Sequence, residues 1–220
     1  MAEAIKLDDR GPLSQARISA ARSRAPGPWS VHLRTEHAPD RNAVEAYLEA
    51  AYARTFDGRI RRHYPMLMSV ENGDGAVKAA VGFRFAEAAP LFLEQYLDEP
   101  VQCALARLFR APIARDQIAE IGNLAAENHA ASSFLFLNLA DHLLAARRTH
   151  AVATATRQLR RRFRRLGFVT QSLTRADPAR LSCGGAEWGG YYARDPEVLA
   201  GAIGQTPPCL VQVRARKSAR

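Results

Sequence analysis

The stretch QIAEIGNLA at residues 117–125 decides the fold class, because it opens a run of alternating strands and helices. It is short and mostly apolar and contains one glycine, which is typical of a strand. A helix is predicted for 132–147, and AVATAT at 151–156 has the residue types of the next strand. The apolar residues of this helix share one side at Phe136, Leu139, Leu143 and Leu144. The order strand, helix, strand predicts a sheet that is covered by helices.

Upstream of this stretch, the sequence predicts a β-hairpin. Residues 66–70 and 76–85 are its strands, and ENGDG at 71–75 supplies the turn. In the second strand apolar residues alternate with smaller or charged ones, so one face of this strand is predicted to be buried. Arg84 lies on the other face, beside Gly82.

The remaining segments extend the same alternation. We expect a strand at 29–33, a helix that Asp40 caps, and helices at 91–97 and 101–109. Downstream, a basic helix at 158–166 ends at Gly167 and a strand follows at 168–173. The last 40 or so residues have no regular pattern. Together the segments predict an α/β (α+β) fold, with a mixed sheet and helices on both faces.

Length and composition predict one domain at 28–205, between a mobile arm at 1–27 and a basic tail at 206–220. The three cysteines fit no disulfide framework, and neither they nor the six histidines have metal-ligand spacing. The longest apolar stretch, 134–146, is too short to cross a bilayer, and no secretory signal is visible. We therefore expect a cytoplasmic protein. Its net charge of +9 favours anionic partners.

Several phrases along the chain are similar in order and wording to the thermostable hemolysin family. They are Gly82–Arg84, Leu91–Asp98, Ala119–Ala125, Thr154–Thr156, Leu173–Asp177 and Trp188–Tyr192. The resemblance covers about residues 30–205 and implies a GNAT-like fold with a mixed, mostly antiparallel central sheet. It is closest in plan to the acyl-homoserine lactone synthases, which move an acyl chain from an acyl carrier protein to an amine.

One difference from acyltransferases that use CoA concerns the donor. Those enzymes hold the CoA pyrophosphate with a glycine-rich loop at a helix N-terminus. The corresponding residues here, 126–133, contain no glycine, and Ser132 or Ser133 is expected to cap the helix. A thioester on an acidic acyl carrier protein therefore fits better than acyl-CoA as co-substrate, and no tightly bound cofactor is expected. Its docking surface would be the basic helix, at Arg157, Arg160, Arg161 and Arg164.

Three residues are candidates for the chemistry. Glu120, in the strand that should border the acyl cleft, could accept a proton from the attacking amine. Glu94 lies in an apolar phrase and needs a partner or a role, and Arg84 is the expected partner. Each acid could instead belong to a structural ion pair.

Further residues are candidates for binding substrate. Asn123 could bond a substrate carbonyl or satisfy the backbone at a bulge near Gly122. Lactone synthases often carry arginine near this point, so asparagine argues against their substrate S-adenosylmethionine. Thr154 and Thr156 share one side of a predicted strand and could line the cleft, or merely favour the strand. An acyl tunnel could end at Trp188, Tyr191 and Tyr192, which could equally form a small hydrophobic cluster.

The leading hypothesis is an N-acyltransferase that delivers an acyl group to a small amine or amino-acid-like acceptor. Two alternatives remain open. One is a membrane-active hemolysin that perturbs anionic bilayers without catalysis. The other is a non-catalytic module that binds acyl chains. Nucleic acid is the weakest candidate partner, because no nucleic-acid motif accompanies the arginines.

Overall fold

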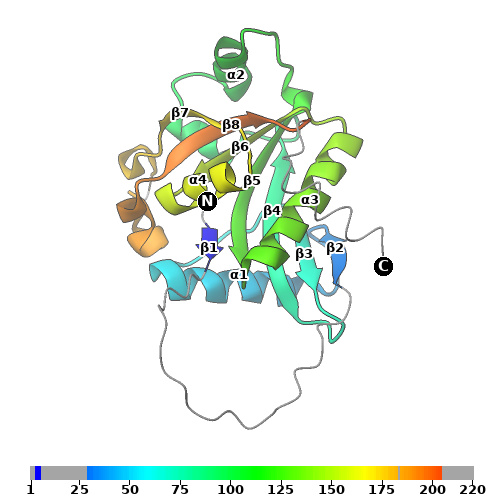
Figure 1. The fold of residues 1–220 in the computed structure, drawn as a ribbon. Coiled ribbons are helices and arrows are strands. Elements are labelled where there is room, and N and C mark those ends of the chain that lie inside the picture. Colours follow the sequence, from blue (N-terminus) through cyan, green and yellow to red (C-terminus); the bar gives the residue numbers. More distant parts are fainter. Residues whose placement is uncertain (1–2, 6–28, 183, 205–220) are drawn as a thin grey trace.

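The computed structural model describes residues 3–5, 29–182 and 184–204 of the chain, and its central feature is one mixed sheet (Figure 1). The strands are β1 (Glu3–Ile5), β2 (Ser30–Arg34), β3 (Met66–Glu71), β4 (Val77–Phe85), β5 (Ile118–Ala126), β6 (His150–Ala155), β7 (Gln171–Arg175) and β8 (Glu197–Ala202). The α-helices are α1 (Arg41–Phe56), α2 (Val101–Phe109), α3 (His129–Ala145) and α4 (Arg157–Arg165). Short 3-10 helices are η1 (Phe92–Tyr96), η2 (Arg115–Gln117), η3 (Pro178–Arg180) and η4 (Ala186–Arg194).

The sheet confirms the predicted class. Its strand order is β2-β3-β4-β5-β6-β8-β7, and β1 pairs with β5 off this path. The β5–β6 and β1–β5 pairs are parallel, and the other pairs are antiparallel. Most of the predicted arm, and the predicted tail at 206–220, lie outside the described residues. Within the described ranges, no helix combines the length and apolarity that a membrane span requires.

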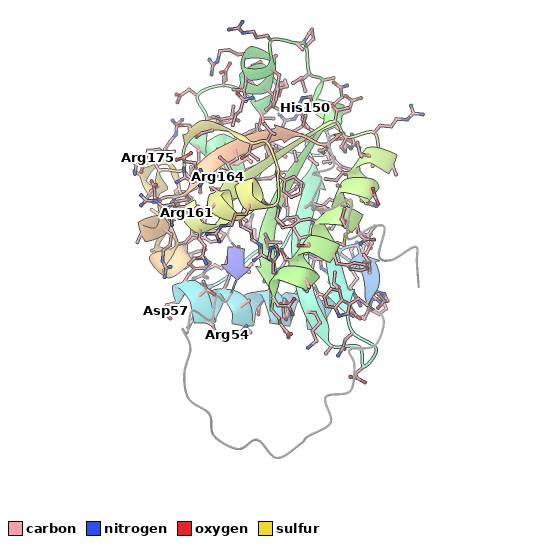
Figure 2. The ribbon with its side chains drawn as sticks, in the orientation of Figure 1. Arg54, Asp57, His150, Arg161, Arg164 and Arg175 are labelled. Carbon is pink, nitrogen blue, oxygen red and sulfur yellow. The ribbon has the colours of Figure 1, made fainter. Side chains whose placement is uncertain are left out.

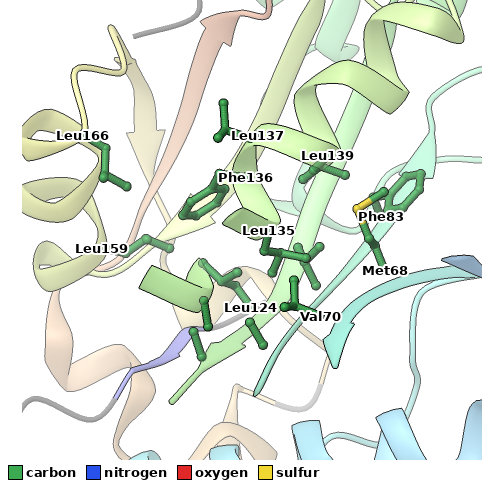
Figure 3. Close-up of a cluster of buried hydrophobic side chains, with 14 of the residues drawn as sticks. Met68, Val70, Phe83, Leu124, Leu135, Phe136, Leu137, Leu139, Leu159 and Leu166 are labelled. Carbon is green, nitrogen blue, oxygen red and sulfur yellow. The ribbon is translucent and has the colours of Figure 1, made fainter. Parts of the chain in front are cut away.

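Helices cover both faces of the sheet. Helices α3 and α4 lie over one face, where Met68, Phe83 and Leu135 belong to the largest apolar cluster (Figure 3). Helix α1 covers part of the other face, with Leu48 packed among residues such as Leu67 and Ala80. Neighbouring residues of β3 and β4 therefore belong to different clusters, as the alternation along a strand requires. The predicted burial of one face of β4 is confirmed but incomplete, because every residue from Ala79 to Phe83 is buried and both faces are therefore covered there.

Strand β8 corrects the prediction that the last 40 or so residues are irregular. It lies between β6 and β7 and pairs antiparallel with both. Its sequence, EVLAGA, contains one β-branched residue and two small alanines, so its local preference for a strand is weak. The pairing partners on both sides impose the strand.

The helix ends show which side chains act as caps. Asp40 does not cap α1, because its carboxylate pairs with Arg34 at 2.6 Å. Helix α3 begins at His129, and Asn128 caps it by accepting the N–H of Ala131. The predicted caps Ser132 and Ser133 lie inside this helix and are buried.

One further segment differs from prediction, and another agrees with it. The helix predicted at 91–97 is the shorter 3-10 helix η1. The end of α4 is as predicted, because Gly167 has φ +82° and the N–H of Phe168 bonds back to the carbonyl of Phe163.

The parallel strands β5 and β6 separate halfway along their length. They pair from Ile118–His150 to Ile121–Ala153 and not beyond. Just past this point β5 bulges, because Gly82 pairs with Gly122 while Ala80 pairs with Ala125. Two residues of β5, Asn123 and Leu124, therefore face one residue of β4. The edge of β5 beyond the bulge pairs with the backbone of β1 instead of β6.

Candidate active site

Glu120 is the buried acid at the centre of the sheet. Its side chain is 1% exposed, and it lies directly opposite Arg84 of β4 in the strand pairing. Arg84 Nε is 3.4 Å from Glu120 Oε2. The backbone N–H groups of Phe92 and Leu93 in η1 donate to the two carboxylate oxygens, at 3.0 and 2.9 Å. The carboxylate is therefore fixed by one cation and two amides.

The environment of Glu120 suits a proton acceptor. Burial raises the pKa of Glu120, while Arg84 and the two backbone N–H groups oppose this shift without cancelling it. A carboxylate with a raised pKa binds a proton more strongly than an exposed glutamate does. Such a group can take a proton from an amine at neutral pH.

Glu94 has a different partner from the predicted one. It forms a bidentate ion pair with Arg115, at 2.6 and 2.7 Å, and not with Arg84. It also accepts the backbone N–H groups of Leu91 and Val101. Burial acts to raise the pKa of Glu94, but the bonds from Arg115 and these amides lower it to about 2. Glu94 thus connects Leu91, just before η1, with Val101, the first residue of α2.

Asn123 occupies the bulge of β5 in an unusual state. Its φ is +48°, a left-handed conformation that asparagine tolerates better than most residues. The side chain is fully buried, and neither its Nδ2 nor its Oδ1 has a hydrogen-bond partner among the described residues. A buried amide without partners is costly in a folded protein, so it marks a position where a ligand is expected.

The two threonines predicted to share a strand face have different roles. Thr154 is buried on β6, and its carbonyl accepts the hydroxyl of Tyr191 at 3.2 Å. Thr156 lies one residue beyond β6 and caps α4, where its hydroxyl accepts the N–H of Leu159. The prediction of a shared strand face was therefore wrong for Thr156.

The predicted aromatic cluster exists and extends beyond η4. Trp188 contacts the rings of Tyr52 and Phe92, with centroids 6.4 and 5.8 Å apart. Tyr192 shares a 2.5 Å hydrogen bond with the hydroxyl of Tyr96 in η1. The cluster therefore links α1, η1 and η4 on the Glu120 side of the sheet.

Tyr64 belongs to this site although sequence reasoning did not select it. Its fully buried ring lies against Gly82, where a Cβ would come within 2.7 Å of the ring. The guanidinium carbon of Arg84 is 4.8 Å from the ring centroid. The available signal was Gly82, because a glycine inside a strand often marks the close approach of another group.

An apolar cavity of about 110 Å³ lies on the opposite face of the sheet, between α3 and α4. Its lining includes Phe136 and Ala140 of α3, Phe163 of α4, and Val169. Ile121 and Ala153, the last paired residues of β5 and β6, also line it. The cavity therefore begins where these two strands separate.

The family model described as "Thermostable hemolysin" matches residues 34–206 of this 220-residue sequence. The chain belongs to the thermostable hemolysin family. No curated protein has significant sequence similarity to this chain.

Solved structures share the fold of this thermostable hemolysin family member. The acyl-homoserine lactone synthase LasI is 12% identical with a TM-score of 0.58, over 84% of this chain and 94% of its own. FeeM, an N-acyl amino acid synthase from uncultured soil microbes, is 14% identical with a TM-score of 0.58, over 87% and 99%. BjaI, a CoA-dependent acyl-homoserine lactone synthase, is 14% identical with a TM-score of 0.58, over 86% and 89%. At these identities the similarity establishes the GNAT-like fold.

The four arginines of α4 that were predicted to dock a carrier protein divide into two groups. Arg157 and Arg160 pair with Asp195, and Arg160 also pairs with Glu197. Arg161 and Arg164 are exposed and have no acidic partner among the described residues; both are labelled at α4 in Figure 2. Within the same ranges, no group of three or more histidine, cysteine or acidic side chains is arranged to hold a metal ion.

Proposed function

We propose that this protein is an N-acyltransferase that transfers an acyl group from a carrier-bound thioester to a small amine. The observation that carries the proposal is Glu120, a buried carboxylate with a raised pKa beside the point where β5 and β6 separate. The GNAT-like fold supports the same reaction class, although a fold alone does not determine a function.

In the proposed reaction, the amine nitrogen attacks the thioester carbonyl carbon and forms the new C–N bond. Glu120 takes a proton from the nitrogen, the C–S bond breaks, and the thiolate leaves and takes up a proton. Arg84 and the N–H groups of η1 hold the Glu120 carboxylate in place and limit the rise of its pKa. Most of the rate enhancement would come from this positioning.

The edge of β5 beyond the bulge is the proposed seat of the donor arm. This edge can pair with an extended chain, as its pairing with the β1 backbone illustrates. A pantetheine arm carries two amides and would take the place of β1 there. Asn123, whose amide has no partner among the described residues, would then bond the thioester or the last amide of the arm.

The cavity between α3 and α4 is the proposed site of the acyl chain. Its walls are apolar, and it starts at Ile121 and Ala153, at the fork of the two strands. At the surface Leu144 and Val169, which also line it, are 41% and 72% exposed. A hydrocarbon chain that extends from the fork would bury this apolar surface.

The exposed arginines of α4 are the proposed docking surface for an acidic carrier protein. Arg161 and Arg164 remain available, whereas Arg157 and Arg160 are engaged within the chain. The start of α3 also favours a carrier protein over CoA, because Asn128 already takes the N–H of Ala131 and no glycine loop precedes it.

The ion pair of Glu120 and Arg84 suits an acceptor that resembles an amino acid. Glu120 would bind the nitrogen, while the guanidinium of Arg84, whose side chain is 24% exposed, would bind a carboxylate. The structurally similar FeeM is an N-acyl amino acid synthase, which supports this acceptor class.

Mass spectrometry of extracts from cells that make the wild type or its Glu120→Gln variant tests this function. We expect an acylated amine that the variant does not produce, and its mass identifies both substrates. If both extracts lack such a product when acyl carrier protein is co-expressed, acyl transfer is rejected.

The family's name points to cell lysis, and an acylated amine would explain lysis without direct membrane attack. A molecule with one acyl chain and a polar head is a surfactant. Pure protein without donor should therefore release no dye from anionic vesicles, whereas the extracted product should. Dye release by the protein alone would favour direct membrane activity instead.

A further inference from the structure

The two backbone N–H groups that hold Glu120 belong to the short helix η1. Its five residues form a 3-10 helix, in which the hydrogen bonds have poorer geometry than in an α-helix. The N–H groups of Phe92 and Leu93 bond to the carboxylate only while η1 stays in this position. The placement of the proposed base therefore depends on the contacts that fix η1 from outside.

Arg180 fixes the end of η1. It lies on η3, and its guanidinium donates to the carbonyls of Gln95 and Leu97 at 3.0 and 2.9 Å. It also pairs with Asp98 at 2.7 Å. The two carbonyls flank Tyr96, so one planar guanidinium spans the last turn of η1. A lysine lacks this fork and could not bond both carbonyls in the same geometry.

Tyr192 fixes the same turn of η1 from η4. Its hydroxyl forms the 2.5 Å hydrogen bond with the hydroxyl of Tyr96, which is 1% exposed. The Tyr192 ring is itself closely packed, because a Cβ at Gly185 would come within 2.7 Å of this ring and 2.9 Å of Pro178. Gly185 has φ +75°, a conformation that favours glycine. The segments of η3 and η4 thus support η1 together.

We propose that Arg180 and Tyr192 are positioning residues, which hold η1 so that its N–H groups remain on Glu120. Both act on the carboxylate through η1. If η1 loosens, its two amide bonds weaken, so the carboxylate binds its proton more tightly and is less well oriented towards the amine. The inference rests on the proposed acyl transfer, in which Glu120 is the base.

The double variant Arg180→Lys/Tyr192→Phe tests the inference. It removes the guanidinium fork and one hydroxyl, and it leaves the net charge unchanged. The ionisable groups that face Glu120 among the described residues all remain, and they are Arg84, Tyr64 and Tyr96. A change in the pKa of Glu120 would therefore reflect the contacts of η1 and not a lost charge.

The pH dependence of kcat/KM is the readout. In the double variant, we expect its acid limb to move to higher pH by about one unit, the change that loss of one amide bond to a charged group produces. We also expect kcat to fall roughly tenfold.

The matched control is Arg107→Lys/Tyr47→Phe. Arg107 pairs with Glu99, and the Tyr47 hydroxyl donates to the Lys78 carbonyl, so neither contact involves η1. The control should lower the Tm by about 2–4 °C and leave the acid limb and kcat unchanged.

A merely structural role predicts a different result. If Arg180→Lys/Tyr192→Phe has a lower Tm but an acid limb at the wild-type pH, the two residues serve stability alone. The inference is then rejected while acyl transfer stands. If the double variant does not fold, Tyr192→Phe against Tyr47→Phe gives the same comparison with one oxygen removed from each. If the wild type forms no product, acyl transfer itself fails and the positioning role fails with it.

Discussion

At Glu120, two opposing influences set the proton affinity of one carboxylate. Burial raises its pKa, and Arg84 with the amides of Phe92 and Leu93 limits that rise. Because the ionised form is the proton acceptor, activity should fall as the pH drops through a pKa above 4.5, the ordinary value for glutamate.

The variant Arg84→Met should move this acid limb to higher pH. Without the guanidinium the carboxylate keeps its burial but loses its cation, so its pKa rises further. The pH dependence of kcat/KM for wild type and variant measures the shift. An acid limb at the same pH in both proteins would mean that Glu120 is not the titrating base.

The variant Arg115→Met tests the ion pair with Glu94. It leaves a half-buried carboxylate without its cation, and the free energy of unfolding should fall by about 1–2 kcal/mol, between the losses typical of exposed and of buried pairs. The control Arg107→Met removes the exposed partner of Glu99 and should change stability by under about 1 kcal/mol. Equal losses in urea unfolding would contradict the structural role.

The same ion pair predicts an acid-dependent stability. The folded-state pKa of Glu94 is about 2, below its ordinary 4.5. Its stabilising contribution is therefore complete above about pH 4.5 and is lost as the pH falls towards 2. Stability measured across this window should decline less in Arg115→Met than in the wild type.

Sequence reasoning found some residues of this site and missed others for physical reasons. Glu120 was selected because it lies in the strand that was expected to border the acyl cleft, where a carboxylate can accept a proton. Arg115 was not, because its pairing with Glu94 depends on how the segment between β4 and β5 folds back. Tyr64 was missed because a loop before β3 places it, and only Gly82 marked its contact.

At the scale of elements, two of the six arginines of α4, Arg157 and Arg160, pair with acids of the fold, whereas Arg161 and Arg164 are exposed. The variant Arg161→Glu/Arg164→Glu should raise the KM for an acidic carrier protein at least tenfold, and added salt should weaken wild-type binding. The control Arg54→Glu reverses an exposed charge on α1, distant from α4 in Figure 2, and should not alter this KM. If both proteins bind the carrier as the wild type does, α4 is not the docking surface.

The space between α3 and α4 predicts the length of the acyl chain. Since a cavity of 150 Å³ holds a benzene molecule, a phenyl ring takes up most of about 110 Å³. Ala140→Phe should therefore shift the product towards shorter chains, while Ala179→Phe on exposed η3 should not. Mass spectrometry of the product distinguishes these results. An unchanged chain length in Ala140→Phe would place the acyl group elsewhere.

Across the whole molecule, long periodic elements were predictable and tertiary ones were not. Helix α3 and the hairpin of β3 and β4 follow from apolar spacing and turn residues alone. Strand β8 and the bulge at Asn123 depend on neighbours distant in the sequence, so no local pattern reveals them. The site includes such non-local features, which explains why its residues were easier to name than its contacts.

The most direct test of the central claim is thiol release by purified protein, supplied with its acyl donor and the amine found in extracts. We expect wild-type protein to release one thiol for each acylated amine, and Glu120→Gln to be slower by about 10²-fold or more while keeping a native Tm. Glutamine has only one acceptor oxygen for the two backbone N–H groups that Glu120 accepts, so Glu120→Gln could fail to fold. In that case Glu120→Asp, which keeps both oxygens but moves them back by one methylene, replaces it in the same assay. A folded Glu120→Gln protein that releases thiol at the wild-type rate would contradict the assignment of Glu120 as the base.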